Sequence, residues 1–182
     1  MKVIMVAVSS INGKITRGLD PNIYSWTSKE DTKFFFSLIK KHSLIVMGSK
    51  TYETVRKVIK HEKDKLRIVL TREPKKYSEE AKKGMLEFTN ENPSKLIKKM
   101  ESRGYKKLLI VGGGTINTLF LKSKLVNEIY LTFEPKIFGS GKNLIKEENL
   151  DITLKLISAK KLNRQGTTLL KYRVSKMKGY DI

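Results

Sequence analysis

A glycine triplet that follows an aliphatic run is the strongest chemical signal in this chain. Leu108–Val111 is aliphatic, Gly112-Gly113-Gly114 comes next, and Thr115 opens a segment whose apolar residues have helical spacing. Such a turn presents bare backbone N–H groups at a helix N-terminus, which binds phosphate favourably. A tight turn that merely needs positive φ angles explains the triplet equally well, and neither common phosphate-binding spacing of glycines is present. Nucleotide binding and a plain turn both remain open.

Small or basic polar residues follow the other aliphatic runs of the chain. The first run is followed by Ser9-Ser10, which leads to Ile15. The second run is followed by Ser49, Lys50 and Thr51, and the third by Thr71 and Arg72. Ligands of open α/β sheets bind at the carboxyl ends of the strands. Several such clusters at one edge predict a site for one long anionic cofactor.

Two acids, Glu30 and Asp31, follow Trp26-Thr27-Ser28 at the start of an expected helix. Thr27-x-x-Glu30 fits a capping box and Ser28-x-x-Asp31 resembles one, so helix capping accounts for both acids. Asp31 also precedes Phe34 and Phe35. In a partly apolar site its carboxyl group would have a raised pKa suited to proton transfer. Both roles stay open for Asp31.

Aliphatic runs alternate with amphipathic segments along the chain. Strands are expected at 3–9, 44–47, 66–71, 85–88, 108–111 and 127–134, and helices at 28–41, 50–59, 92–104 and after the glycine triplet. Alternating segments at 152–161 and 167–176, joined by a turn with Gly166, predict an antiparallel hairpin. The expected fold is a single α/β domain over 1–182, with a mostly parallel central sheet, about four flanking helices and a frayed tail at 178–182.

The composition limits the chemistry. The 182 residues contain no cysteine and only two histidines, His42 and His61, which have no spaced ligand partners, so we expect no metal site. No run reaches the length of a membrane span and the start of the chain is too short for a signal peptide, so a cytoplasmic location without membrane contact is expected.

The net charge of +20 attracts polyanions and anionic metabolites. Nucleic-acid binding is therefore a hypothesis from a different functional class. The lysines are spread over almost every surface segment, however, and no nucleic-acid module is recognisable. A basic nucleic-acid-binding domain is kept only as the non-enzyme alternative.

Five segments resemble dihydrofolate reductase, in order and at compatible spacings. They are Trp26-x-x-x-x-Asp31-x-x-x-Phe35, 46–53, 68–74, 110–114 and 129–132. The motifs Gly139-Ser140-Gly141 and 163–167 extend the resemblance over nearly the whole chain. The set is specific for the superfamily, which also includes the reductase domain of riboflavin biosynthesis. Ser10-x-x-Gly13-Lys14-Ile15 is similar to that branch too.

The resemblance implies NADPH as cofactor and a site residue by residue. The pyrophosphate of the cofactor would be held by Gly112, Gly113, Gly114 and Thr115, around a cis Gly112-Gly113 peptide. Other phosphate oxygens would be bound by Ser49, Lys50 and Thr51, and the 2′-phosphate by Thr71 and Arg72. The nicotinamide would lie against Ala7 and Ile15. For the substrate, Asp31 with Thr132 and Trp26 would be catalytic, Asp31 binding the pterin and promoting protonation at N5. Val6 and Phe35 would line the substrate site, and Lys65 or Arg67 would bind the carboxylate of folate.

Departures from the dihydrofolate reductase pattern weaken the assignment of folate as substrate more than the assignment of the cofactor. Ser49 stands where an arginine is usual, the usual Gly-Arg-Pro-Leu-Pro is absent, and the arginine for the folate carboxylate falls on Lys65. Lysine lacks the bidentate fork of arginine. The sequence predicts NADPH-dependent reduction of 7,8-dihydrofolate to tetrahydrofolate by a monomer or homodimer. The alternative enzyme is a riboflavin-pathway reductase of a ribosylamino-pyrimidinone 5′-phosphate.

Overall fold

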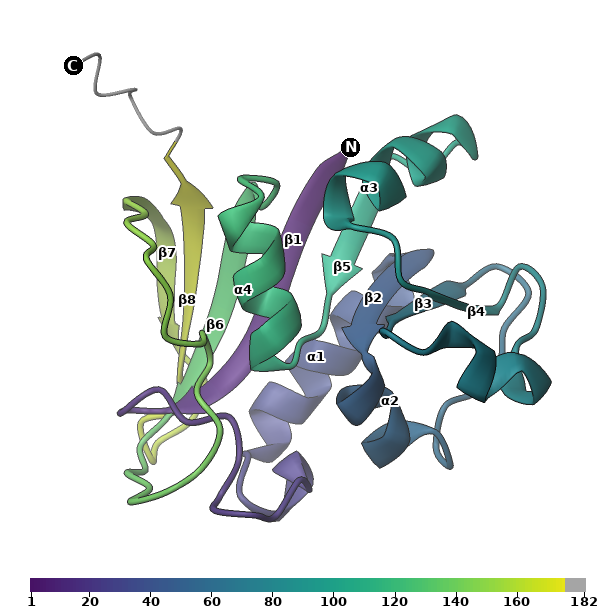
Figure 1. Cartoon of the computed structure of the whole chain (residues 1–182). Helices are drawn as coiled ribbons and strands as arrows, with labels where there is room; N and C mark the ends of the chain where they lie inside the picture. Colours follow the sequence, from purple (N-terminus) through teal and green to yellow (C-terminus); the bar gives the residue numbers. More distant parts are fainter. Residues whose placement is uncertain (176–182) are drawn as a thin grey trace.

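The computed structural model describes residues 1–175, which form one eight-stranded sheet flanked by helices (Figure 1). The strands are β1 (Lys2–Ser10), β2 (Leu44–Gly48), β3 (Leu66–Leu70), β4 (Leu86–Thr89), β5 (Lys107–Ile110), β6 (Glu128–Glu134), β7 (Leu154–Lys161) and β8 (Thr168–Val174). The helices are α1 (Lys29–Lys41), α2 (Ser49–Val55), α3 (Pro93–Ser102) and α4 (Gly114–Lys122), with 3₁₀ segments η1 (Ile23–Ser25) and η2 (Pro74–Glu80).

The strand order is β4-β3-β2-β5-β1-β6-β8-β7. The first six strands in this order are parallel, and β8 and β7 close the sheet as an antiparallel hairpin. The expected α/β class, the mostly parallel sheet, the C-terminal hairpin and the four α-helices are confirmed. The expected frayed tail at 178–182 lies outside the described residues.

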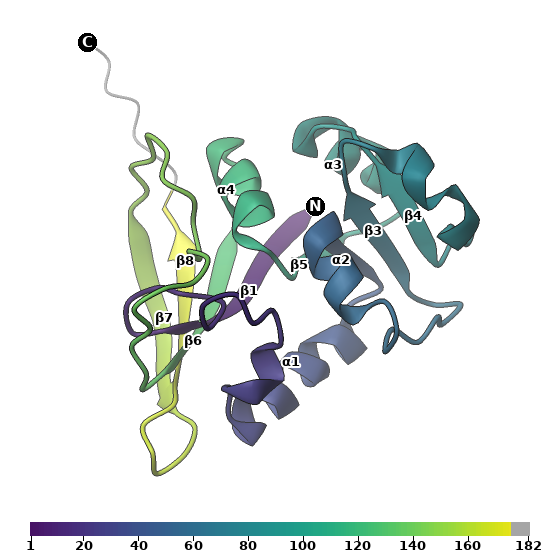
Figure 2. The ribbon, with the colours of Figure 1, turned by 60° about the horizontal axis from the view of Figure 1, so that its bottom comes forward.

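The core has two layers because successive strand residues point to opposite faces of the sheet. Val3 and Met5 of β1 pack with α3 and α4 on one face. Ile4 and Val6 of the same strand pack with α1 and α2 on the other face. β2, β3 and β5 are almost entirely apolar because they are covered on both sides, as is usual for parallel strands. Figures 1 and 2 show this arrangement of helices around the sheet.

The carboxyl ends of the six parallel strands meet at one edge of the sheet. The strand register pairs Val8 of β1 with Thr132 of β6, and both Met5 and Val46 with Ile110 of β5. At the end of β2, the Gly48 N–H donates to the Gly112 carbonyl oxygen at 3.0 Å. This edge, which we call the carboxyl edge, therefore brings together segments that lie far apart in the sequence.

Three local features differ from the sequence prediction. The helix expected at 50–59 ends at Val55, and the following Arg56–Val58 only forms a turn, because β-branched and like-charged residues support a helix poorly. Segment η2 was not predicted; Pro74 starts it and Tyr77 stacks on Phe88, with ring centroids 4.8 Å apart. The strand expected from residue 152 begins at Leu154.

Candidate active site

Helix α1 begins at the carboxyl edge and places Asp31 in its first turn. Ser28 is the N-cap, and its hydroxyl oxygen accepts a hydrogen bond from the Asp31 backbone N–H at 3.2 Å. In a full capping box the acid three residues after the cap would return a bond to the Ser28 N–H. Here the Ser28 N–H donates to Oε1 of Glu134 at 2.7 Å instead. The Asp31 side chain is thus not needed for capping.

The Asp31 carboxyl group is buried in a way that changes its acidity. The residue is only 6% exposed. The pKa of Asp31 is raised from 3.8 to about 6, chiefly by burial and in part by the negative charge of Glu134, while the Thr132 hydroxyl opposes the rise. Asp31 can therefore gain or lose a proton close to neutral pH.

Two polar atoms near the start of α1 and the end of β6 are buried without a partner. Trp26 Nε1 and Thr132 Oγ1 have no hydrogen bond of normal geometry to any described residue. Trp26 is 3% exposed and packs edge-on against Phe138, with ring centroids 5.2 Å apart. Buried polar atoms are usually satisfied, so these two indicate a place for a polar ligand or for water.

Glu134 is a site residue that the sequence analysis missed. It is 2% exposed and lies two residues after Thr132 on the same face of β6. Its Oε2 accepts a hydrogen bond from the Thr167 hydroxyl at 2.7 Å. The signal in the sequence was the two-residue period of the strand, which places Thr132 and Glu134 on the side that faces α1.

The glycine triplet forms the turn between β5 and α4, as predicted. The Gly112-Gly113 peptide is cis, as the resemblance implied, and Gly112 has φ +91°. Gly113 is the N-cap of α4 and offers no side-chain bond to the first N–H groups of the helix. A Cβ on Gly114 would overlap the Asn143 carbonyl oxygen, and one on Gly113 would lie 3.4 Å from Thr51 Oγ1. The first N–H groups of α4 thus have no side-chain cap, and neighbouring backbone packs closely against Gly114.

The other residues expected to bind the cofactor lie around this turn. Ser49, Lys50 and Thr51 form the first turn of α2, whose N-cap Gly48 also lacks a side-chain bond. Ile15 reaches Gly113, since a Cβ there would lie 3.9 Å from Ile15 Cδ1. Thr71 and the exposed Arg72 follow β3 at the same edge, and Thr115 is exposed in the first turn of α4.

The residues expected around the substrate ring divide between the two faces of the sheet. Val6 is buried on the α1 face, and Phe35 is half-buried against the same core. Ala7, the next residue of β1, belongs to the core on the α4 face. The structure therefore brings Val6 and Phe35 to the side where Asp31 lies and places Ala7 on the opposite side.

Lys65 and Arg67 lie at the other end of β3, away from the carboxyl edge. Their side chains are 4% and 7% exposed, and Glu62 pairs with both, with N–O distances of 3.6 Å and 3.5 Å. Arg67 Nη1 is buried without a partner among the described residues. These cations are covered by the chain's own carboxylate and are not brought together with Asp31.

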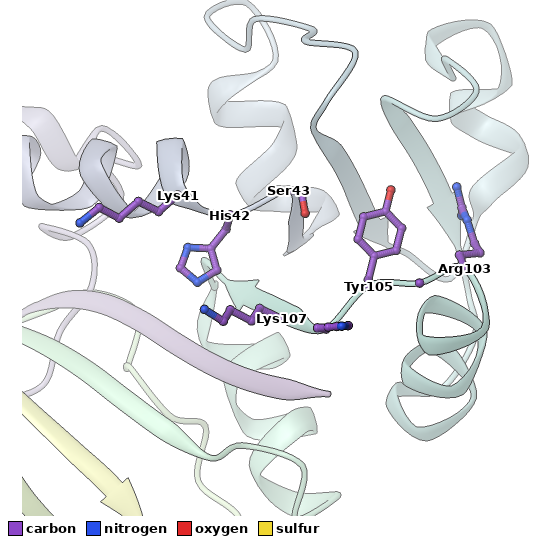
Figure 3. Close-up of a pocket in the computed structure, with 8 residues that line it drawn as sticks. Lys41, His42, Ser43, Arg103, Tyr105 and Lys107 are labelled. Carbon is purple, nitrogen blue, oxygen red and sulfur yellow. The ribbon is translucent and has the colours of Figure 1, made fainter.

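A depression of about 360 Å³ lies at the opposite, amino edge of the sheet. Its wall includes Lys41, His42, Tyr105 and Lys107, and Figure 3 shows Lys107 pointing toward His42 while Lys41 points away. Arg103 is already bound by Glu87 at 2.7 Å and 2.9 Å. The side chains do not converge on one point, so this depression is a weaker candidate site than the carboxyl edge.

Other functional classes find little support in the described part of the chain. Residues 1–175 contain no group of three or more histidine, cysteine, aspartate or glutamate side chains placed to hold a metal ion. Within the same residues, no helix combines the length and apolar character that a membrane span requires.

The sequence resembles known proteins over most of its length. The model of the RibD C-terminal domain matches residues 1–167. The uncharacterized protein YyaP of Bacillus subtilis (strain 168) is 29% identical over 73 residues, which cover 40% of this chain and 39% of that protein.

Solved structures agree on the fold. A putative riboflavin biosynthesis protein from Shewanella sp. PV-4 has a TM-score of 0.78 at 21% identity, covering 97% of this chain and 100% of that one. A diaminohydroxyphosphoribosylaminopyrimidine deaminase/5-amino-6-(5-phosphoribosylamino)uracil reductase from Thermotoga maritima scores 0.73 at 15% identity, covering 96% of this chain and 56% of that one. Dihydrofolate reductase from Enterococcus faecalis scores 0.65 at 17% identity, covering 96% and 97%.

These findings correct the sequence-based preference for dihydrofolate reductase itself. The superfamily was recognised correctly, but the family match and the riboflavin-type structures outweigh the folate enzyme. The chain belongs to the RibD C-terminal domain family, whose fold is that of dihydrofolate reductase.

Proposed function

We propose that this protein is an NADPH-dependent reductase whose substrate is a ribosylamino-pyrimidinone 5′-phosphate. One observation carries the proposal: the buried Asp31 carboxyl group and the buried Thr132 hydroxyl lie at the same sheet edge as the glycine turn. A polar heterocycle at Asp31 and an anionic cofactor at the glycine turn would then share one site.

The residues at the glycine turn suit the phosphates of NADPH. Two helices begin there without side-chain caps, and glycine stands where a Cβ would crowd the neighbouring chain. Helix N-termini favour anions. We assign the pyrophosphate to Gly112–Thr115 and neighbouring phosphate oxygens to Ser49–Thr51. Arg72 is the residue we assign to the 2′-phosphate, since its planar fork binds phosphate in two places.

NADPH, when bound, supplies the hydride. In the substrate, the C1′=N bond of the ring-opened ribosyl imine gains that hydride at carbon and a proton at nitrogen, which gives a ribitylamino group. Asp31 can supply this proton, because the raised pKa of its carboxyl group, about 6, leaves a fraction of it protonated near neutral pH. The Trp26 indole N–H can donate a hydrogen bond to the pyrimidinone ring, and the Thr132 hydroxyl can donate or accept one. All three side chains are buried, so they are shielded from bulk solvent.

Dihydrofolate is the second candidate substrate, because Asp31, Phe35 and Thr132 occupy the positions that the resemblance assigns to pterin recognition. Two observations favour the pyrimidinone. The family match is to the RibD C-terminal domain. Lys65 and Arg67, the cations that would have to bind the folate carboxylate, both pair with Glu62 and lie at the amino end of β3, away from the carboxyl edge.

The test is NADPH oxidation with each substrate as sole acceptor, comparing kcat/KM. The proposal expects a higher kcat/KM for the ribosylamino-pyrimidinone phosphate, and a large loss in Asp31→Asn but not in the exposed control Asp151→Asn. A higher value for dihydrofolate would replace the substrate assignment with the second candidate. No turnover of either substrate by protein that binds NADPH would refute the proposed function.

A further inference from the structure

The start of α1 is bound by Glu134, which lies at the end of β6. Glu134 at the end of β6 accepts the Ser28 N–H at one oxygen, 2.7 Å away, and the Thr167 hydroxyl at the other, also at 2.7 Å. Ser28 itself caps the Asp31 N–H. One buried carboxylate thus joins β6, α1 and the start of β8.

The direction of these bonds is fixed by the turn that precedes β8. Asn163 Oδ1 accepts the backbone N–H groups of Gly166 and Thr167, both at 3.1 Å. Its Nδ2 must therefore donate, and it does so to Thr167 Oγ1 at 2.9 Å. The hydroxyl proton of Thr167 is left for Glu134, so both Glu134 oxygens act as acceptors, which suits a carboxylate.

Capping decides what the Asp31 side chain can do. In a capping box, the acid three residues after the cap returns a bond to the N–H of the cap residue, and such a bond would draw Asp31 onto its own helix. Because Glu134 already accepts the Ser28 N–H, no such bond is formed by Asp31. Among the described residues, only the Thr132 hydroxyl lies close enough to the Asp31 carboxyl group to lower its pKa through a hydrogen bond, and Asp31 is 6% exposed.

We propose that Glu134 is a positioning residue of the reductase site: it takes over the capping bond to Ser28 and so keeps the Asp31 carboxyl group free for the substrate. This inference rests on the proposed function. Glu134 does not touch the reacting atoms. It acts through Ser28 and α1, and its hydrogen bond to Thr167 sets its position.

The charge of Glu134 has a separate effect that the test must isolate. The groups that influence or face Asp31 are Glu134 and Thr132 from β6 and Tyr24 from η1, whose own pKa is raised by burial and by the charge of Asp31. No cation contributes to the shift of Asp31 among the residues described. Any uncharged residue at position 134 therefore lowers the pKa of Asp31, whether or not it caps Ser28.

Two uncharged variants of Glu134 separate the effect of its hydrogen bond to Ser28 from the effect of its negative charge. Glu134→Gln keeps an acceptor within reach of the Ser28 N–H, whereas Glu134→Met has the same chain length but no good acceptor. In Glu134→Met we expect Asp31 to turn back to Ser28. The Ser28 amide proton shift of the free protein then follows the titration of the Asp31 carboxyl carbon in Glu134→Met and does not follow it in Glu134→Gln.

Activity gives a second readout. The acid plateau of kcat/KM, where Asp31 is protonated, stays within about twofold of wild type in Glu134→Gln but falls about tenfold in Glu134→Met, a loss of about 1.4 kcal/mol in transition-state stabilisation. In both variants, the midpoint of the pH profile of kcat/KM moves to lower pH than in wild type. Glu128→Gln, at the other end of β6, is the control on the same strand and keeps the wild-type profile.

The two proposals fail in different ways. Equal behaviour of the Ser28 amide in Glu134→Gln and Glu134→Met, or equal loss of the plateau in both, would overturn the positioning role. If Glu134→Met does not fold, Glu134→Gln alone tests the positioning role. A loss of the acid plateau of kcat/KM in Glu134→Gln would then contradict the proposal. Lack of turnover in wild-type protein would refute the proposed function, while the amide measurement still tests the capping.

Discussion

Replacing Asp31 by asparagine should make the protein more stable at neutral pH while removing its activity. A buried carboxyl group with a raised pKa stabilises the fold when it is protonated, because the folded state then binds a proton that the unfolded state releases. This contribution is fully present below pH 3.8 and is lost as the pH rises through about 6. The amide side chain of the variant would stay neutral throughout.

The size of the effect follows from the two pKa values. A rise from 3.8 to about 6 corresponds to roughly 3 kcal/mol, since each pKa unit corresponds to about 1.36 kcal/mol. Solvent screens this group little, because Asp31 is 6% exposed. Relative to wild type, the free energy of unfolding of Asp31→Asn should therefore rise by roughly 3 kcal/mol between about pH 3.5 and about pH 8.

Urea unfolding across this pH range measures the difference directly. Any effect of asparagine on packing is the same at each pH and cancels in the trend. Asp151→Asn, at an exposed position before β7, gives the baseline for the substitution itself. A difference between wild type and Asp31→Asn that does not change with pH would refute the claim that a buried, ionisable Asp31 shapes this site.

Three further predictions concern the cofactor and the charge. Arg72→Ala should weaken NADPH binding by roughly 10- to 100-fold, the effect of losing a charge-assisted contact, and leave NADH binding unchanged; equal losses in fluorescence titrations with both cofactors would show that Arg72 does not bind the 2′-phosphate. Gly114→Ala should destabilise the fold by about 1–3 kcal/mol and weaken NADPH binding, because the new methyl group overlaps the Asn143 carbonyl oxygen. Thermal unfolding checks this against Gly139→Ala, where nothing lies within 4 Å, and equal stability of the two variants would contradict it. Binding to duplex DNA should be weak and should fall steeply with salt, as expected for nonspecific phosphate contacts; tight binding that resists salt would favour the nucleic-acid alternative.

Sequence reasoning recovered the elements whose signals are local. The aliphatic runs marked the strands, and the glycine triplet marked the turn into α4. The end of α2 was missed because helix periodicity continues through Val58 and Ile59, although the chain there is not helical. Periodicity reports which residues are apolar and not whether their backbone bonds are made.

The two explanations of Asp31 could not be separated from the sequence, because the answer lies more than 100 residues away. Ser28 does cap α1, as the capping pattern predicts. The reciprocal bond, however, is made by Glu134 of β6, and only the sheet topology brings that residue to Ser28. Lys65 and Arg67 illustrate the same limit, since their burial and their shared partner Glu62 depend on how the loop before β3 folds.

The central claim is that hydride passes from NADPH to a ribosylamino-pyrimidinone phosphate at this site. The most direct test is to supply NADPH deuterated at the transferred C4 position and to analyse the product by mass spectrometry. The account predicts one deuterium at C1′ of the ribityl chain, and no transfer in Asp31→Asn at neutral pH. Deuterium at C6 of tetrahydrofolate, with none in the pyrimidinone product, would contradict the substrate assignment, and its absence from both products would contradict the reductase itself.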